Sequence, residues 1–121
     1  MKAALRIRID FDEGPILSPG KVRLFELVGQ CGSIEEAAAA VQMDGGRAQQ
    51  VIASLEGFFG APLIVTRQDG VNGPRSELTE LARKMIERYR AAERTSALAA
   101  ERFIDDLLSL APDRQPAPDP E

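Results

Sequence analysis

The segment Ser33–Phe59, SIEEAAAAVQMDGGRAQQVIASLEGFF, decides the fold of this chain. Ser33 and Glu36 have the S-x-x-E spacing of a capping box, in which side chains and backbone satisfy each other's free amides at the start of a helix. Asp44 suits the N-cap of a second helix. Two short helices joined by a tight turn are typical of a helix-turn-helix, whose second helix can enter the DNA major groove. On this segment alone, an ordinary pair of packed helices remains the alternative.

Apolar residues recur at helical spacing in both halves of the segment. Those of the first helix are Ile34, Ala37, Ala38 and Val41, and those of the second are Val51, Ile52, Leu55, Phe58 and Phe59. Arg47, Gln49 and Gln50 fall mostly off the second stripe. The second helix therefore has one apolar and one polar side.

The flanking sequence predicts a winged helix around this segment. Residues 5–11, LRIRIDF, alternate apolar and charged side chains as a half-buried strand does, with Arg6 and Arg8 facing solvent. Ser18 and Pro19 start a helix that ends near Gly32, with Cys31 as a small buried side chain at its terminus.

A β-hairpin is predicted directly after the second helix of the helix-turn-helix. Residues 63–67 are rich in β-branched side chains, residues 68–75 in turn formers, and residues 76–79 return as a short strand. The N-terminal strand could add a third strand to this hairpin. The order of helix, helix-turn-helix and hairpin defines a winged helix, which an ordinary pair of packed helices does not predict.

A long helix is predicted from its cap Thr79 to about Leu110. It would extend about 45 Å at a rise of about 1.5 Å per residue, farther than so small a domain can cover. Its apolar positions form a heptad-like seam that needs a partner, and we expect a homodimer. The predicted dimerisation residues are Met85, Tyr89, Ala92, Ser96, Ala99, Phe103, Leu107 and Leu110.

These elements give a mainly α fold with a small β-hairpin wing and a long C-terminal dimerisation helix. The predicted organisation is a winged helix-turn-helix domain in residues 1–78, the dimerisation helix in residues 79–110 and a disordered, proline-rich tail in residues 111–121.

Composition constrains the function classes. The chain has no histidine and one cysteine, which removes the usual general base, a disulfide within the chain and a thiolate metal cluster. We expect no enzyme and no cofactor. No apolar run is long enough to span a membrane, and the N-terminus lacks the hydrophobic stretch of a signal peptide, so a cytoplasmic protein is expected.

The charge is unusual for a DNA-binding protein. Fifteen Lys and Arg face nineteen Asp and Glu, a net charge of −4 in 121 residues, of which −2 lies in residues 111–121. DNA affinity comes largely from neutralised phosphates, so net charge argues against strong binding but leaves a local basic face open.

Several short motifs, taken in order, resemble a known family. They are LRIRIDF at 5–11, Gly20-Lys21, Gly32-Ser33-Ile34 with Ala37-Ala38, Arg47-Ala48, Leu63-Ile64-Val65 and Leu78-Thr79. Together they resemble the N-terminal winged-helix domain of ModE-type molybdate-responsive transcriptional regulators over roughly residues 4–105. The GSI…AA and LT motifs are also similar to those of LysR-type regulators.

The resemblance implies a dimeric DNA-binding repressor or activator. Full-length members of the family bind molybdate in C-terminal domains. Because nothing follows the predicted dimerisation helix and its tail here, the chain resembles single-domain members, and molybdate is not expected to bind it.

The start of the recognition helix departs from the family pattern of a serine, an aromatic and a basic residue. Asp44, Gly45 and Gly46 occupy these places. An aspartate repels phosphate, and glycines have no base-reading side chain. Their bare backbone would, however, let the helix N-terminus approach a phosphate closely.

The residues expected to contact double-stranded DNA fall into two groups. Arg47 suits guanine, and Gln49 and Gln50 suit adenine. The bare backbone of Gly45 and Gly46 would let the helix N-terminus approach a phosphate. The positioning contacts expected from the first helix and the wing are Lys21, Arg23, Arg67, Asn72 and Arg75. The alternative is a winged-helix protein–protein interaction module with weakened or lost DNA binding, motivated by residues 44–46 and the net charge.

Overall fold

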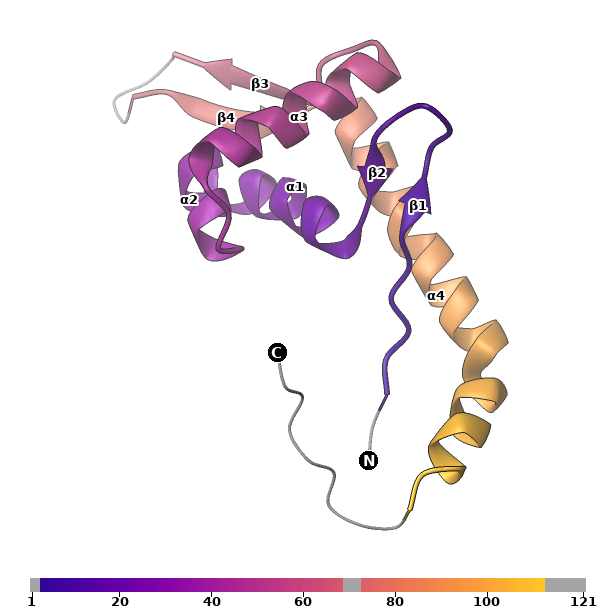
Figure 1. Ribbon diagram of the computed structural model, residues 1–121. Coiled ribbons are helices and arrows are strands. Elements are labelled where there is room, and N and C mark those ends of the chain that lie inside the picture. The colour runs from indigo at the N-terminus through magenta and orange to yellow at the C-terminus, as the bar shows by residue number, and fades with distance from the viewer. Residues whose placement is uncertain (1–2, 69–72, 113–121) are drawn as a thin grey trace.

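The computed structural model of the chain describes residues 3–68 and 73–112. Over these residues the elements are β1 (Ile9–Asp10), β2 (Ile16–Leu17), α1 (Pro19–Cys31), α2 (Ile34–Ala40), α3 (Gly45–Phe59), β3 (Ile64–Arg67), β4 (Arg75–Leu78) and α4 (Glu80–Ser109) (Figure 1). The helix-turn-helix of α2 and α3 is followed by the β3–β4 wing, which confirms the predicted winged helix with a long C-terminal helix.

The predicted helix starts are also confirmed. Ser18, Ser33, Asp44 and Thr79 are the N-caps of the four helices in the described part of the chain, and the side chain of each accepts a hydrogen bond from a backbone amide two or three residues on. Gly32 ends α1 with a φ of 73°. Glycine adopts this left-handed conformation without the steric cost of a Cβ.

The hydrophobic core draws on all four helices. Its buried side chains include Val22, Leu24, Phe25 and Val28 of α1, Ala37 and Ala38 of α2, Ala48, Val51, Ile52 and Leu55 of α3, and Ala82, Met85 and Tyr89 of α4. The beginning of α4 therefore shares one core with α1, α2 and α3.

The N-terminal strand does not join the wing, so the expected third strand is wrong. β1 pairs antiparallel with β2 in a separate two-stranded sheet, Ile9 opposite Leu17. The turn after Phe11 folds the chain back on itself, and closing so short a loop costs less entropy than reaching the distant wing. Phe11 then stacks on Phe58 at the end of α3, with ring centroids 4.5 Å apart.

The cysteine was expected to be buried, and it is exposed. Cys31 is the last residue of α1, and its side chain lies beside the backbone, with Sγ 3.5 Å from the carbonyl oxygen of Ser33. The apolar stripe of α1 ends one turn earlier, at Val28, so the helix has no core left to contact at its last residue.

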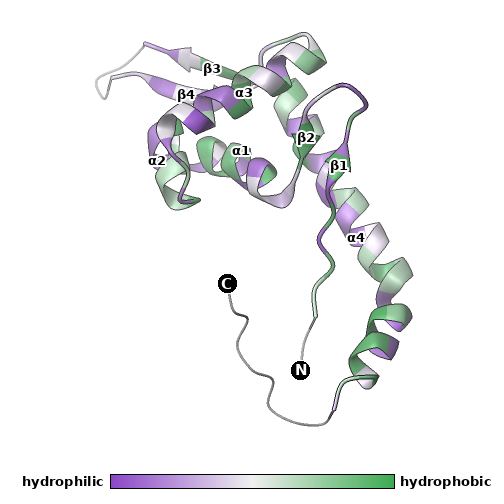
Figure 2. Ribbon diagram, viewed as in Figure 1, coloured by the Kyte–Doolittle hydropathy of each residue, from purple (hydrophilic) through white to green (hydrophobic). Residues whose placement is uncertain are grey.

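The second half of α4 extends away from the domain (Figure 1). After Tyr89 no residue of α4 is buried in the described structure. Leu98, Phe103, Leu107 and Leu110 are all more than half exposed. Figure 2 shows the hydrophobic character of this projecting end. The predicted tail from residue 113 onward and the wing tip, residues 69–72, lie outside the described residues.

Candidate nucleic-acid interface

A carboxylate caps the first turn of α3. Asp44 Oδ2 accepts hydrogen bonds from the amides of Gly46, at 3.0 Å, and Arg47, at 3.3 Å. A negative charge at a helix N-terminus interacts favourably with the helix dipole. Two amides that would attract a phosphate are therefore occupied, and a phosphate at this end of α3 would have to displace the Asp44 carboxylate.

The polar side of α3 faces solvent, as the sequence predicts. Arg47, Gln49 and Gln50 are exposed, while Ala48 and Val51 point into the core. Gln50 follows Arg47 by about one helical turn, so these two side chains are neighbours on the helix surface. Gly45 has open space where a Cβ would stand, so the backbone at the start of the helix is not covered by a side chain at this position.

The ammonium of Lys21 on α1 lies within electrostatic reach of two arginines, Arg47 on α3 and Arg8 just before β1. The Nζ of Lys21 donates a hydrogen bond to the carbonyl oxygen of Ile16 at 2.8 Å, which holds the ammonium partly buried. Burial lowers the pKa of Lys21, and the charges of Arg47 and Arg8 lower it further. Since like charges in proximity repel, an anion bound among them would relieve that repulsion.

Arg8 is exposed, as the sequence predicts, with 63% of its side chain accessible. It ion-pairs with Asp10 at 2.7 Å and yet lies near enough to Lys21 to affect its pKa. No local signal reveals this, because Arg8 and Lys21 are 13 residues apart and meet only in the folded chain.

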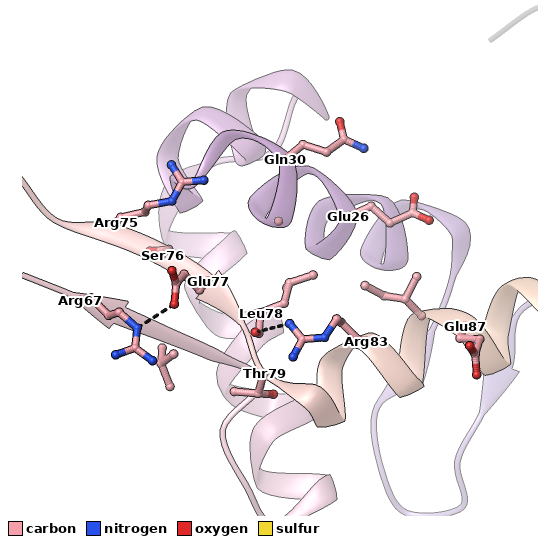
Figure 3. A pocket seen from close by; sticks show the side chains of 13 residues that line it. Glu26, Gln30, Arg67, Arg75, Ser76, Glu77, Leu78, Thr79, Arg83 and Glu87 are labelled. Atoms are coloured by element: carbon pink, nitrogen blue, oxygen red, sulfur yellow. Dashed lines mark hydrogen bonds and ion pairs between the residues drawn. The ribbon is translucent and has the colours of Figure 1, made fainter. Parts of the chain in front are cut away.

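The wing carries two arginines directly opposite each other. Arg67 of β3 pairs with Arg75 of β4 in the sheet register. Like charges facing each other across strands destabilise a hairpin unless other groups compensate. Arg67 donates to Glu77 at 2.7 Å, and the Arg75 side chain lies against Gly32 instead (Figure 3). The third predicted wing contact, Asn72, lies outside the described residues.

A groove of about 880 Å³ is lined by residues of the wing, α1 and α4 (Figure 3). Its charged lining residues are Arg67, Arg75 and Arg83 with Glu26, Glu77 and Glu87. Because three cations face three anions, the groove itself does not favour an anionic ligand.

Two side chains fix the wing relative to α3. Glu56 of α3 accepts hydrogen bonds from the amides of Leu63 and Ile64 at 2.9 and 3.3 Å, which anchors the start of β3. The hydroxyl of Thr79 donates to the carbonyl oxygen of Pro62 at 2.8 Å, which ties the start of α4 to the same point. Glu56 has no sequence signature, because its partners lie beyond the end of its own helix.

The predicted dimerisation residues divide into two groups. Met85 and Tyr89 are buried in the core of their own domain, with exposed fractions of 7% and 2%. Ala92 and Ser96 are half-buried. The exposed members are Ala99, Phe103, Leu107 and Leu110. The surface left for a partner therefore begins after Tyr89.

In residues 3–68 and 73–112, no helix has the length and apolarity needed to cross a membrane. No group of three or more potential metal-ligating side chains comes together in the same residues.

Comparison with known proteins gives two relatives. The chain is 31% identical over 102 residues to the "Molybdenum transport protein ModE" of Azotobacter vinelandii, which covers 84% of this chain and 38% of the relative. It is 27% identical over 104 residues to the "Transcriptional regulator ModE" of Haemophilus influenzae, covering 86% of this chain and 41% of the relative. No protein-family model matches the chain.

The chain thus spans about two fifths of the length of the curated relatives it matches. Over more than four fifths of its own length, it is similar to proteins named ModE.

Proposed function

We propose that this chain is a dimeric winged-helix DNA-binding transcriptional regulator. The observation that carries the proposal is the exposed Arg47 in the first turn of α3, with the ammonium of Lys21 within electrostatic reach of it. In the described part of the chain, Arg47 forms no ion pair, so its guanidinium remains available to an anionic partner. The name of the Haemophilus influenzae relative, a transcriptional regulator, supports the same function.

Each group of residues has a distinct role in this proposal. Arg47 would donate two hydrogen bonds to guanine, and Gln49 and Gln50 would read adenine. Lys21, Arg67 and Arg75 would contact phosphates and set the register of α3 in the groove. Residues 1–78 would supply the DNA-binding surface and residues 79–110 the dimer contact. Acting on DNA, the protein would work in the cytoplasm.

The second candidate is a winged-helix protein–protein interaction module without specific DNA binding. Asp44 favours this candidate, since its carboxylate covers the amides at the start of α3. The net charge of −4 favours it too, because nonspecific attraction to DNA is then weak.

Selection of bound sequences from random duplex DNA separates the two candidates. A regulator enriches one sequence class, and Arg47→Ala then weakens binding to it by about 1–3 kcal/mol. Arg94→Ala is the matched control, because Arg94 is an exposed arginine on α4. It should bind as the wild type does.

Two results would contradict DNA reading by α3. One is that no sequence is enriched by the wild-type protein. The other is equal affinity of wild type and Arg47→Ala for the enriched sequence throughout a salt series. Either result leaves the interaction module as the better description.

A further inference from the structure

Two consecutive residues of α4 tie it to the rest of the molecule. Tyr89 is buried, and its hydroxyl donates a hydrogen bond to the carbonyl oxygen of Ile7 at 2.6 Å. Arg90 reaches α1, where Nε and Nη2 donate to the two carboxylate oxygens of Glu26 at 3.0 and 2.9 Å. Its Nη1 donates to Glu93 at 2.6 Å. The Arg90 guanidinium is thus held by two carboxylates.

The geometry of these ties restricts how α4 is oriented. Successive residues on a helix point about 100° apart, so Tyr89 and Arg90 hold α4 from two directions. A bidentate arginine–carboxylate pair adds directionality that a lysine cannot supply, because both groups are planar and matched. The side chains of Arg90 and Glu26 are only 28% and 21% exposed, so solvent screens the pair less than a surface ion pair.

Beyond Arg90, α4 projects from the domain, so a small change in its tilt produces a large displacement of its far end. From Arg90 to Ser109 the helix runs for about 28 Å at its rise of about 1.5 Å per residue. A change of about 10° in its tilt would move the far end by about 5 Å. That displacement exceeds the spacing of about 3.4 Å between neighbouring base pairs.

We propose that the Glu26–Arg90 pair is a positioning element that sets the distance between the two α3 helices of the dimer, and with it the half-site spacing on DNA. This inference rests on the function proposed above. The pair does not touch DNA. It acts through the direction in which α4 leaves the domain.

The first test measures the α3-to-α3 distance in solution. A spin label at Ser54→Cys on α3, in a Cys31→Ser background, reports one distance per dimer by pulsed electron paramagnetic resonance. We expect one narrow distance distribution for the otherwise unsubstituted chain. The distribution should be clearly broader for Arg90→Lys, which keeps the positive charge but cannot form the bidentate pair with Glu26. Arg94→Lys is the control, because Arg94 is an exposed arginine on α4 outside the Glu26–Arg90–Glu93 contacts.

The second test uses DNA carrying two copies of the selected half-site with every spacing over one helical turn. The wild type should prefer one spacing by about tenfold, and Arg90→Lys and Glu26→Gln should reduce that preference to about twofold or less. Affinity for a single half-site should stay unchanged, because the DNA-reading residues are intact.

Each outcome has one meaning. An unchanged distance distribution in Arg90→Lys, with unchanged spacing profiles in both variants, would overturn the proposal. Lower unfolding midpoints would not rescue it, because they show only that the pair stabilises the fold. A wild-type dimer with a narrow distance but no enriched DNA would refute the proposed function while leaving the positioning role measurable. Absence of any distance between protomers in the wild type would refute both the dimer and this inference.

Discussion

At the scale of single residues, Asp44 has two opposing effects. Its carboxylate completes the N-terminus of α3 through hydrogen bonds to two amides. The same charge stands in the first turn of the proposed DNA-reading helix, where it repels phosphate. A side chain that caps without a charge would separate the two effects.

Substitution of Asp44 tests this conflict. Asp44→Ala should lower the free energy of unfolding by about 0.5–2 kcal/mol, because the cap is lost. Asp44→Ser should keep most of that stability, since serine caps as well, and should bind DNA several-fold more tightly than the wild type. Urea denaturation and fluorescence anisotropy at several salt concentrations measure the two quantities. Weaker DNA binding by Asp44→Ser would instead indicate that the aspartate itself contacts a base.

At the scale of secondary-structure elements, the junction of α1 and α4 depends on an ion pair. Hydrogen bonding to Arg90 lowers the pKa of Glu26 below its ordinary value of 4.5, and partial burial opposes this effect. Hydrogen bonds to Glu26 correspondingly raise the pKa of Arg90. Because the Glu26 carboxylate is more acidic in the folded than in the unfolded chain, it stabilises the fold only when ionised.

The resulting pH dependence has a definite sign. The contribution of Glu26 to stability is present above pH 4.5 and is lost as the pH falls through the lowered pKa of the folded state. Wild type should therefore lose stability relative to Glu26→Gln on acidification below pH 4.5, as measured by denaturant unfolding at each pH. In an Arg90→Gln background the two curves should become parallel. A difference that persists there would assign the effect to another partner, such as Arg23.

At the scale of the whole molecule, one domain carries a helix that extends beyond it. The side chains of Phe103, Leu107 and Leu110 are exposed at this end of the molecule, and a monomer would leave them in water. Exposed apolar clusters of this kind mark interaction surfaces in soluble proteins. The proposed dimer would cover them along the seam that includes Phe103 and Leu107.

The dimer is tested by a charge placed on that seam. Phe103 is 55% exposed in the single chain, so Phe103→Asp should leave the domain folded. We expect it to produce monomers in sedimentation velocity, because burying an unpaired carboxylate costs more than a helix seam of this length can offset. Arg94→Asp, on the opposite side of the helix, should remain dimeric. A dimer that survives Phe103→Asp would locate the contact elsewhere.

The sequence by itself determined the helices and their order. Ser18, Ser33, Asp44 and Thr79 start helices by bonding to amides two or three residues away, and such contacts are readable along the chain. Helical periodicity likewise predicted the buried side of each helix, and residues rich in turn formers predicted the wing.

The tertiary structure alone decided which distant groups meet. Lys21 of α1 lies within electrostatic reach of Arg47 of α3 and of Arg8 before β1, and Arg90 pairs with Glu26 at a separation of 64 residues. Apolar residues spaced three and four positions apart show that a helix has an apolar side. They do not show whether that side contacts the helix's own domain or another protein. The predicted seam of α4 therefore included Tyr89, which packs inside its own domain, because core and partner surfaces require the same spacing of apolar side chains.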